Sequence, residues 1–120
     1  MRLFAPLNPP LPAWPTARVW IIGASTGIGA ATAKALLAQG ARVALSARSA
    51  DKLADVAGKA AAAIVLPLDF TDTAAVASAW RQLQSQWQGV DLVLIVAGTH
   101  QEIRAWEVTE QNSRALLETN

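Results

Sequence analysis

The segment Val19-Trp20-Ile21-Ile22-Gly23-Ala24-Ser25-Thr26-Gly27-Ile28-Gly29 sets the architecture of this chain. It joins an apolar run to a turn with three glycines, and an alanine-rich stretch starts at Ala30. An uninterrupted apolar run is typical of a strand buried on both faces of a parallel sheet. Glycines let the backbone turn sharply against a bulky anion, and the first N–H groups of a helix have no partner within it. The segment therefore predicts a strand, a turn and a helix start that together bind phosphate.

Three further apolar runs alternate with helical stretches along the chain. Strands are expected at 18–22, 41–46, 62–68 and 91–96. Helices are expected at 28–39 and 50–57. A third helix is expected between Thr71, its N-cap, and Gly89, where it stops, and Thr109 is expected to cap a fourth. This alternation predicts one α/β domain over residues 17–120, a Rossmann-like open parallel sheet in the spatial order 3-2-1-4 with helices on both faces. The proline-rich residues 1–16 predict an extended arm.

Apolar spacing also predicts how two of these elements are buried. In the third helix Val76, Trp80, Leu83 and Trp87 recur at intervals of four, three and four residues, which indicates one buried stripe. The strand at 91–96 is as apolar as the first, which predicts neighbours on both sides. No fifth strand follows, so we expect an open sheet edge and an incomplete domain, the amino-terminal half of a longer enzyme, which alone would self-associate or be weakly stable.

Composition excludes several classes of function. Ten basic and nine acidic residues give a net charge of +1 without a basic cluster, so a nucleic-acid partner is not expected. The absence of cysteine excludes disulfides, thiol catalysis and cysteine-ligated zinc, and no metal site is indicated. Five prolines within residues 1–16 interrupt any apolar segment there that could serve as a signal peptide or a membrane span. We therefore expect a cytoplasmic protein that does not enter the membrane.

The predicted topology brings three segments to one edge of the sheet. Ligands of open parallel sheets bind beyond the carboxyl ends of the strands where the strand order reverses, here between the first and fourth strands. The glycine turn, Asp69-Phe70 and Ala97-Gly98 all follow strands at this edge. The turn lacks the Lys-Ser/Thr ending of a P-loop, which disfavours an ATPase or GTPase. Structural alternatives stay open, because Gly27 or Gly29 can serve close packing and Asp69 can favour the next helix's positive end.

The Gly-x-x-x-Gly-Ile-Gly turn, Asp69, Ala97-Gly98 and Asn120 resemble the short-chain dehydrogenase/reductase family over residues 18–120. The resemblance implies an NAD- or NADP-binding Rossmann fold, with Gly23, Gly27 and Gly29 beside the pyrophosphate and Asp69 hydrogen-bonded to the adenine ring. The cofactor-binding residues expected on this basis are Gly23, Ser25, Thr26, Gly27, Ile28, Gly29, Arg48, Asp69, Phe70, Ala97 and Gly98.

The choice of dinucleotide rests on the end of the second strand. An acidic residue about 20 positions after the glycine turn would accept hydrogen bonds from the ribose hydroxyls of NAD. That position is Ala47, and Arg48 follows it. A guanidinium binds a 2′-phosphate that a carboxylate would repel, and the hydroxyls of Ser25 and Thr26 would add hydrogen bonds. NADP is therefore expected rather than NAD. The alternative is that Arg48 is an ordinary exposed arginine with no part in cofactor binding.

The resemblance also implies hydride transfer to or from a carbonyl or alcohol carbon by a Ser, a Tyr and a Lys four residues after it, with a helix Asn that supports proton relay. Asn120 lies at the position of that Asn, but the chain contains no tyrosine, and Ile95-Val96 stands where relatives carry Asn. We expect the cofactor-binding half of an NADP-dependent oxidoreductase, which would be inactive alone. Its small substrate is not identified by the sequence. A homo-oligomer is one of the expected assemblies. The alternative is a non-catalytic dinucleotide-binding or interaction module.

Overall fold

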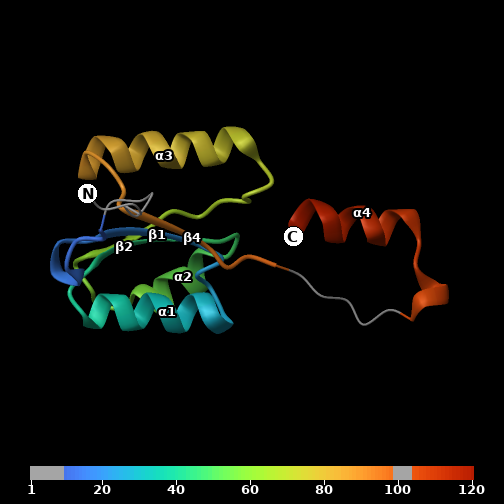
Figure 1. The fold of residues 1–120 in the computed structure, drawn as a ribbon, viewed down its shortest axis with the longest axis horizontal. Coiled ribbons are helices and arrows are strands. Elements are labelled where there is room, and N and C mark those ends of the chain that lie inside the picture. The colour runs from blue at the N-terminus through green and yellow to red at the C-terminus, as the bar shows by residue number, and fades with distance from the viewer. Residues whose placement is uncertain (1–9, 99–103) are drawn as a thin grey trace, which may run out of the picture.

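The fold, a computed structural model that describes residues 10–98 and 104–120, is an open parallel sheet between two helical layers. The strands β1 (Arg18–Ile22), β2 (Arg42–Ser46), β3 (Ala63–Val65) and β4 (Leu92–Ile95) lie in the order β3-β2-β1-β4. Helices α1 (Gly27–Ala38) and α2 (Ala50–Ala57) cover one face, and α3 (Thr73–Trp87) lies on the other (Figure 1). The expected strand order and the helices on both faces are confirmed.

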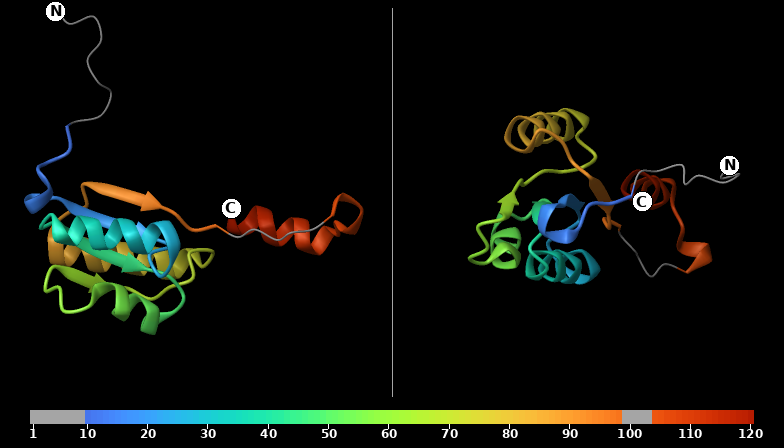
Figure 2. Two further views of the ribbon diagram at one scale, coloured as in Figure 1. Left: turned by 90° about the horizontal axis from the view of Figure 1, so that it is seen from below. Right: turned by 60° about the vertical axis from the view of Figure 1, so that its left-hand side comes forward.

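The remaining elements lie at the two ends of the chain. The short 3-10 helices η1 (Trp14–Thr16) and η2 (Ala105–Glu107) precede β1 and α4 (Glu110–Thr119), respectively. Helix α4 lies beyond the carboxyl ends of the strands, with its own carboxyl end directed back toward the sheet (Figure 2). Part of the expected proline-rich arm, residues 1–9, lies outside the described residues. In the described parts of the chain, no helix has the length and apolar character needed to cross a membrane.

The strands supply two cores, one on each face of the sheet, because successive strand residues point to opposite sides. Val19 and Ile21 pack toward α1 and α2. Trp20 and Ile22 pack toward α3, in the same core as Leu83. The Trp20 side chain is 3% exposed and its Nε1 donates to the Ser46 Oγ at 2.9 Å, which satisfies both polar groups within the core. The burial expected for the uninterrupted apolar run 19–22 is therefore confirmed at Trp20.

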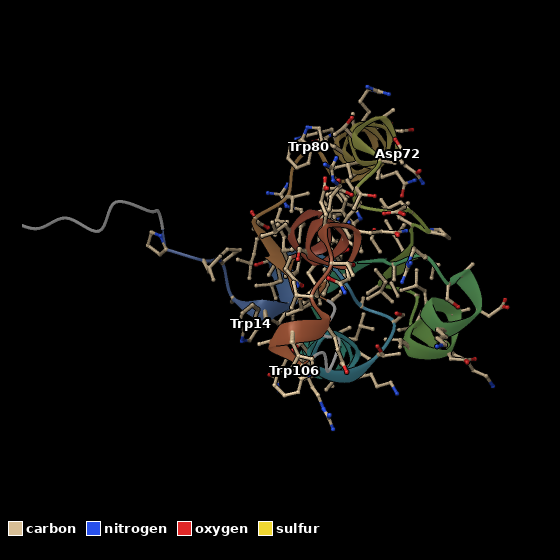
Figure 3. All side chains as sticks on the ribbon, turned by 90° about the vertical axis from the view of Figure 1, so that its right-hand side faces the viewer. Trp14, Asp72, Trp80 and Trp106 are labelled. Atoms are coloured by element: carbon tan, nitrogen blue, oxygen red, sulfur yellow. The ribbon has the colours of Figure 1, made fainter. Side chains whose placement is uncertain are left out.

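The predicted stripe on α3 is correct in its carboxyl half and wrong at Trp80. Leu83 and Trp87 are buried, whereas the Trp80 side chain is 38% exposed. Trp80 stacks on Trp20 with ring centroids 6.4 Å apart, and its side chain lies at the side of α3 (Figure 3). The helical spacing correctly places Trp80 toward the sheet, but no described element covers the outer part of its ring.

The predicted cap of α3 is also wrong. Asp72, rather than Thr71, is the N-cap, because its carboxylate accepts hydrogen bonds from the backbone N–H groups of Ala74 and Ala75. The Thr71 hydroxyl instead donates to Asp69. The cap expected at Thr109 for α4 is confirmed.

Two strands differ from their expected form. The third strand was expected at 62–68, but β3 ends at Val65, because Pro67 has no N–H to continue a regular ladder. Leu66 and Leu68 still donate from their backbone N–H groups to the carbonyls of β2 and the residue after it. β4 forms an edge of the described sheet and exposes 68% of Ile95, so the expected open edge is confirmed.

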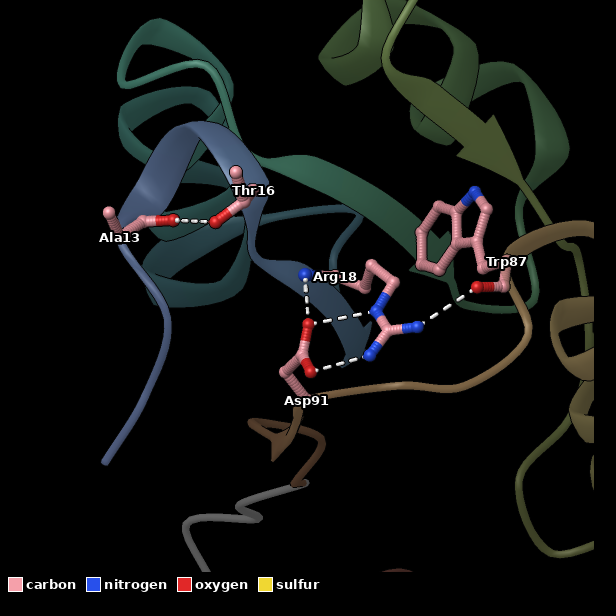
Figure 4. Close-up of polar contacts among 5 residues, drawn as sticks. All are labelled: Ala13, Thr16, Arg18, Trp87 and Asp91. Carbon is pink, nitrogen blue, oxygen red and sulfur yellow. Dashed lines mark hydrogen bonds and ion pairs between the residues drawn. The ribbon is translucent and has the colours of Figure 1, made fainter. Parts of the chain in front are cut away.

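A charged network joins β1, β4 and the end of α3 at the amino edge of the sheet (Figure 4). The Asp91 Oδ2 accepts from the Arg18 backbone N at 2.8 Å and from its Nε at 2.9 Å, and the Asp91 Oδ1 accepts from Nη2 at 2.7 Å. The remaining Nη1 donates to the Trp87 carbonyl at 3.0 Å. Side-chain hydrogen bonds from Arg18 lower the pKa of Asp91 to about 2, aided by the positive charge of Arg18.

Candidate functional site

The glycine turn after β1 is held against two neighbouring segments. The backbone N–H groups of Gly23 and Ala24 donate to the Ser46 carbonyl at 2.8 and 3.1 Å. Gly23 has φ +93°, and a Cβ there would lie 2.6 Å from the Ala97 backbone N. A Cβ on Gly29 would collide with the Gly23 carbonyl oxygen. Gly23 and Gly29 are therefore required by close backbone approach, which agrees with the packing interpretation of Gly29.

Gly27 is required for a different reason. Its φ of +54° lies in the left-handed region, and a Cβ there would meet nothing within 4 Å. Helix α1 begins at this residue, and the preceding Thr26 makes no side-chain cap. The first amide bonded back into the turn is that of Ala30, which donates to the Thr26 carbonyl at 3.2 Å. Among the described residues, the N–H groups of residues 25–29 have no acceptor, so they form a cluster of donors at the positive end of α1.

A cavity of about 630 Å³ opens at the carboxyl edge of the sheet, next to this turn. Its walls come from the glycine turn, the β2–α2 connection, the segment after β3, the segment after β4 and the carboxyl half of α4. Eight of the predicted cofactor-binding residues line it: Gly23, Ser25, Thr26, Arg48, Asp69, Phe70, Ala97 and Gly98. The edge that the topology predicted is therefore a real concavity to which segments distant in sequence contribute.

Four predicted site residues do not line the cavity. Gly27 and Gly29 are not part of its wall, although they follow Ser25 and Thr26, which are, and the Ile28 side chain is 76% exposed on the first turn of α1. Asn120 ends α4, and its Oδ1 lies 3.0 Å from where a Cβ on Gly98 would stand. Asn120 is thus beside the cavity, whose wall includes the preceding Thr119.

Asp69 is fixed in place by its own loop. Its Oδ1 accepts hydrogen bonds from the backbone N–H and the hydroxyl of Thr71, at 3.0 and 2.7 Å. These hydrogen bonds lower the pKa of Asp69, and the positive charge of Arg48 acts in the same direction. The carboxylate is therefore ionised at neutral pH, and its Oδ2 has no partner among the described residues. Asp72, rather than Asp69, accepts hydrogen bonds from the first backbone N–H groups of α3.

Sequence reasoning missed two charged groups of the cavity wall, Lys52 on α2 and Glu118 on α4. The signal for Lys52 was present, because the predicted cap at Ser49 starts α2 and places residue 52 on the first helical turn, beside the end of β2. Glu118 carried no such signal, because the position of α4 relative to the sheet depends on the connection after β4.

The strand order, the glycine turn and the cavity at the switch point define an α/β domain of the dinucleotide-binding type. The chain belongs to the short chain dehydrogenase family, whose model matches residues 17–120. Members of this oxidoreductase family bind NAD or NADP.

Individual relatives agree with this family. An uncharacterised oxidoreductase of Mycobacterium tuberculosis is 30% identical over 109 residues, which cover 86% of this chain and 43% of that protein. A crystal structure of a short-chain type dehydrogenase/reductase from Mycobacterium marinum has a TM-score of 0.80 and 30% identity, and covers 86% of this chain and 43% of that one. A short chain dehydrogenase of Bacillus anthracis shares the fold with a TM-score of 0.85 at 19% identity, over 90% of this chain and 45% of that one. This chain thus spans less than half the length of these proteins.

Proposed function

We propose that this chain binds NADP(H) in the cavity at the carboxyl edge of its sheet, as the cofactor-binding half of an oxidoreductase. The reaction of the whole enzyme is hydride transfer to or from the carbon of a small carbonyl or alcohol substrate. The observation that carries the proposal is the cluster of N–H groups at residues 25–29, which have no acceptor among the described residues and adjoin a cavity of dinucleotide size.

The residues of the cavity fit the parts of a dinucleotide. The amides of residues 25–29 would hold the diphosphate, since helix N-termini favour negative charge. The free Oδ2 of Asp69 would accept a hydrogen bond from the adenine amino group, with Phe70 beside the base. Ala97 and Gly98 leave room for the cofactor to pass along the edge between β1 and β4. When bound, the cofactor supplies or accepts the hydride, which no side chain of this chain can do.

The preference for NADP over NAD rests on the end of β2. The strand ends at Ser46, and the connection begins with Ala47 and Arg48, so no carboxylate occupies the position that would bind the free ribose hydroxyls. Arg48 lines the cavity and forms no ion pair among the described residues. A phosphate monoester carries a charge of about −1.5 to −2 at pH 7, which a guanidinium binds with two parallel hydrogen bonds.

Asn120 is proposed to support proton relay in the whole enzyme, from its place beside Gly98. This chain contains no tyrosine, so we expect it to bind cofactor without turning over a substrate. The same observation favours the alternative, a non-catalytic dinucleotide-binding or interaction module. We further propose a cytoplasmic location, which the absence of cysteine supports. We also propose a homo-oligomeric assembly, which the exposed β4 edge supports.

Parallel titrations with NADPH and NADH, followed by tryptophan fluorescence and calorimetry, test the proposal. We expect saturable binding of both and at least roughly tenfold tighter binding of NADPH, from the charge-assisted contacts of its 2′-phosphate. NADPH at about 100 times its Kd should stabilise the fold by about 2.7 kcal/mol. The Asp69→Asn variant should weaken both cofactors to the same degree, because adenine is common to them. Failure of the wild-type chain to bind either cofactor would refute the proposal.

A further inference from the structure

The face of the sheet that carries α3 is only partly covered. Helices α1 and α2 lie on the other face, whereas α3 is the one helix of the described residues on this face (Figure 1). An apolar groove of about 400 Å³ runs beside α3. Val93, the partner of Trp20 in the sheet register, is 42% exposed next to it, so the apolar surface continues to the edge at β4. The groove is lined by Trp20, Phe70, Thr73, Val76, Ala77 and Trp80.

The amino-terminal arm has the composition that grooves of this kind bind. Arg2 is the only charged side chain among residues 1–12, which include four prolines. Pro6, Pro9 and Pro12 recur at intervals of three residues. A polyproline II helix has three residues per turn, so this spacing gives it one edge made of prolines. Such an edge docks in grooves lined by aromatic side chains, and little conformational entropy is lost because proline already restricts the segment.

The described root of the arm lies on the side of the molecule where Trp80 is exposed. The Thr16 hydroxyl donates to the Ala13 carbonyl at 3.0 Å (Figure 4), and Ala13 has φ −58° and ψ 144°, close to polyproline II values. Just upstream, the Leu11 side chain is 49% exposed. In Figure 3, Trp14 and Trp80 both lie on the side at which β4 forms the edge of the sheet. The arm therefore starts on the side from which the groove is accessible.

The groove is also within reach of the arm. Arg18, which follows η1 closely, donates from its Nη1 to the carbonyl of Trp87 at the end of α3. The helix from Trp87 back to Trp80 is about 10 Å long, since an α-helix rises about 1.5 Å per residue. Residues 1–12 span about 37 Å in a polyproline II conformation, at about 3.1 Å per residue. The arm is thus long enough to enter the groove of its own chain.

We propose that residues 1–12 dock in a polyproline II conformation in the groove beside α3 of the same chain, with their proline edge against the rings of Trp80 and Phe70. Apolar surface of the arm and of the groove is then removed from water together, which drives the docking. Phe70 lines both the groove and the cofactor cavity, so the docked arm lies beside that cavity without entering it. The inference does not depend on the identity of the cofactor.

A nitroxide label on the arm tests this contact in the full chain, which has no native cysteine. Asn8→Cys carries the label, because Asn8 is polar and lies outside the proline series. We expect the label to broaden the indole N–H signal of Trp80 in the nuclear magnetic resonance spectrum, and reduction of the label by ascorbate to restore that signal. Trp80→Phe assigns the signal. The signal of Trp106, which is 78% exposed, is the internal reference and should stay sharp.

Two glutamate variants on α3 separate docking in the groove from chance contacts. Ala77 is exposed and lines the groove, so Ala77→Glu places a charge in it and should abolish most of the broadening at Trp80. Ser78→Glu is the matched control, because Ser78 is the next exposed residue of α3 and does not line the groove. It should leave the broadening in place. Far-ultraviolet circular dichroism verifies that each variant is folded.

Three results would overturn the inference: a sharp Trp80 signal, equal broadening of Trp80 and Trp106, or equal effects of the two glutamate variants. A fourth concerns a second copy of the chain. If the broadening vanishes when the labelled chain is diluted with an excess of unmodified, isotopically unlabelled chain, the groove binds the arm of another molecule, and docking within one chain is wrong. None of these results affects the proposed function, which the cofactor titrations test separately.

Discussion

Replacing Asp91 by Asn should destabilise the fold through the network at the amino edge of the sheet. The change keeps the shape of the side chain but removes the negative charge of the carboxylate, whose two oxygens accept three hydrogen bonds from Arg18. These bonds join β1 to β4, and the fourth contact of Arg18, to the Trp87 carbonyl, holds the end of α3. The side chains of Arg18 and Asp91 are only 26% and 18% exposed, so water replaces the lost charge poorly.

The magnitude follows from the pKa of Asp91, which is lowered to about 2 in the folded chain. An unpaired aspartate titrates near ~3.9, and a difference of this size is worth at most about 2.6 kcal/mol at neutral pH. Solvent screening at a partly exposed site reduces the expected loss to about 1–2 kcal/mol. Because the folded pKa lies below the unfolded one, the contribution is complete above about pH 4 and disappears as the pH falls toward about 2.

Urea unfolding of the wild-type chain and of Asp91→Asn, followed by circular dichroism between pH 7 and pH 2.5, measures the effect. The gap in unfolding free energy should be largest at pH 7 and close as the carboxyl group is protonated. Glu110→Gln serves as the control, because the Glu110–Arg114 pair lies on the surface of α4 and should contribute less than about 0.5 kcal/mol. A gap at pH 7 no larger than that of the control, or one that persists unchanged at pH 2.5, would refute this reasoning.

Two further changes test the turn and its support. Gly23→Ala should cost more than about 2 kcal/mol in urea unfolding, because the new methyl would meet the backbone of Ala97. Gly27→Ala, with open space around its Cβ, should cost only the roughly 1 kcal/mol of left-handed strain, so equal losses in the two variants would contradict this assignment. Ser46→Ala should destabilise the fold by about 1–3 kcal/mol and shift the tryptophan emission, because the buried Trp20 Nε1 loses its acceptor; an unchanged spectrum would argue against the hydrogen bond.

Most of the fold was predictable because its signals are local. The apolar runs and the glycines after them gave the strand order, and Ser49 and Thr109 were identified correctly as helix caps. The cap of α3 was misplaced by one residue, because Asp72 and Thr71 are both good capping residues. The choice between them depends on where the chain leaves the sheet edge, where Asp69 binds Thr71.

The candidate site divides in the same way. The sequence alone establishes that a glycine turn follows an apolar strand and that Asp69 and Gly98 follow two others, since strand order places such residues at one edge. Tertiary structure was needed to show that Trp80 is part-exposed, that Lys52 joins Arg48 on the cavity wall and that α4 brings Glu118 to it. Periodicity tells which way a side chain points from its own helix. What covers that side chain, and which charges face it, depends on segments far away along the chain.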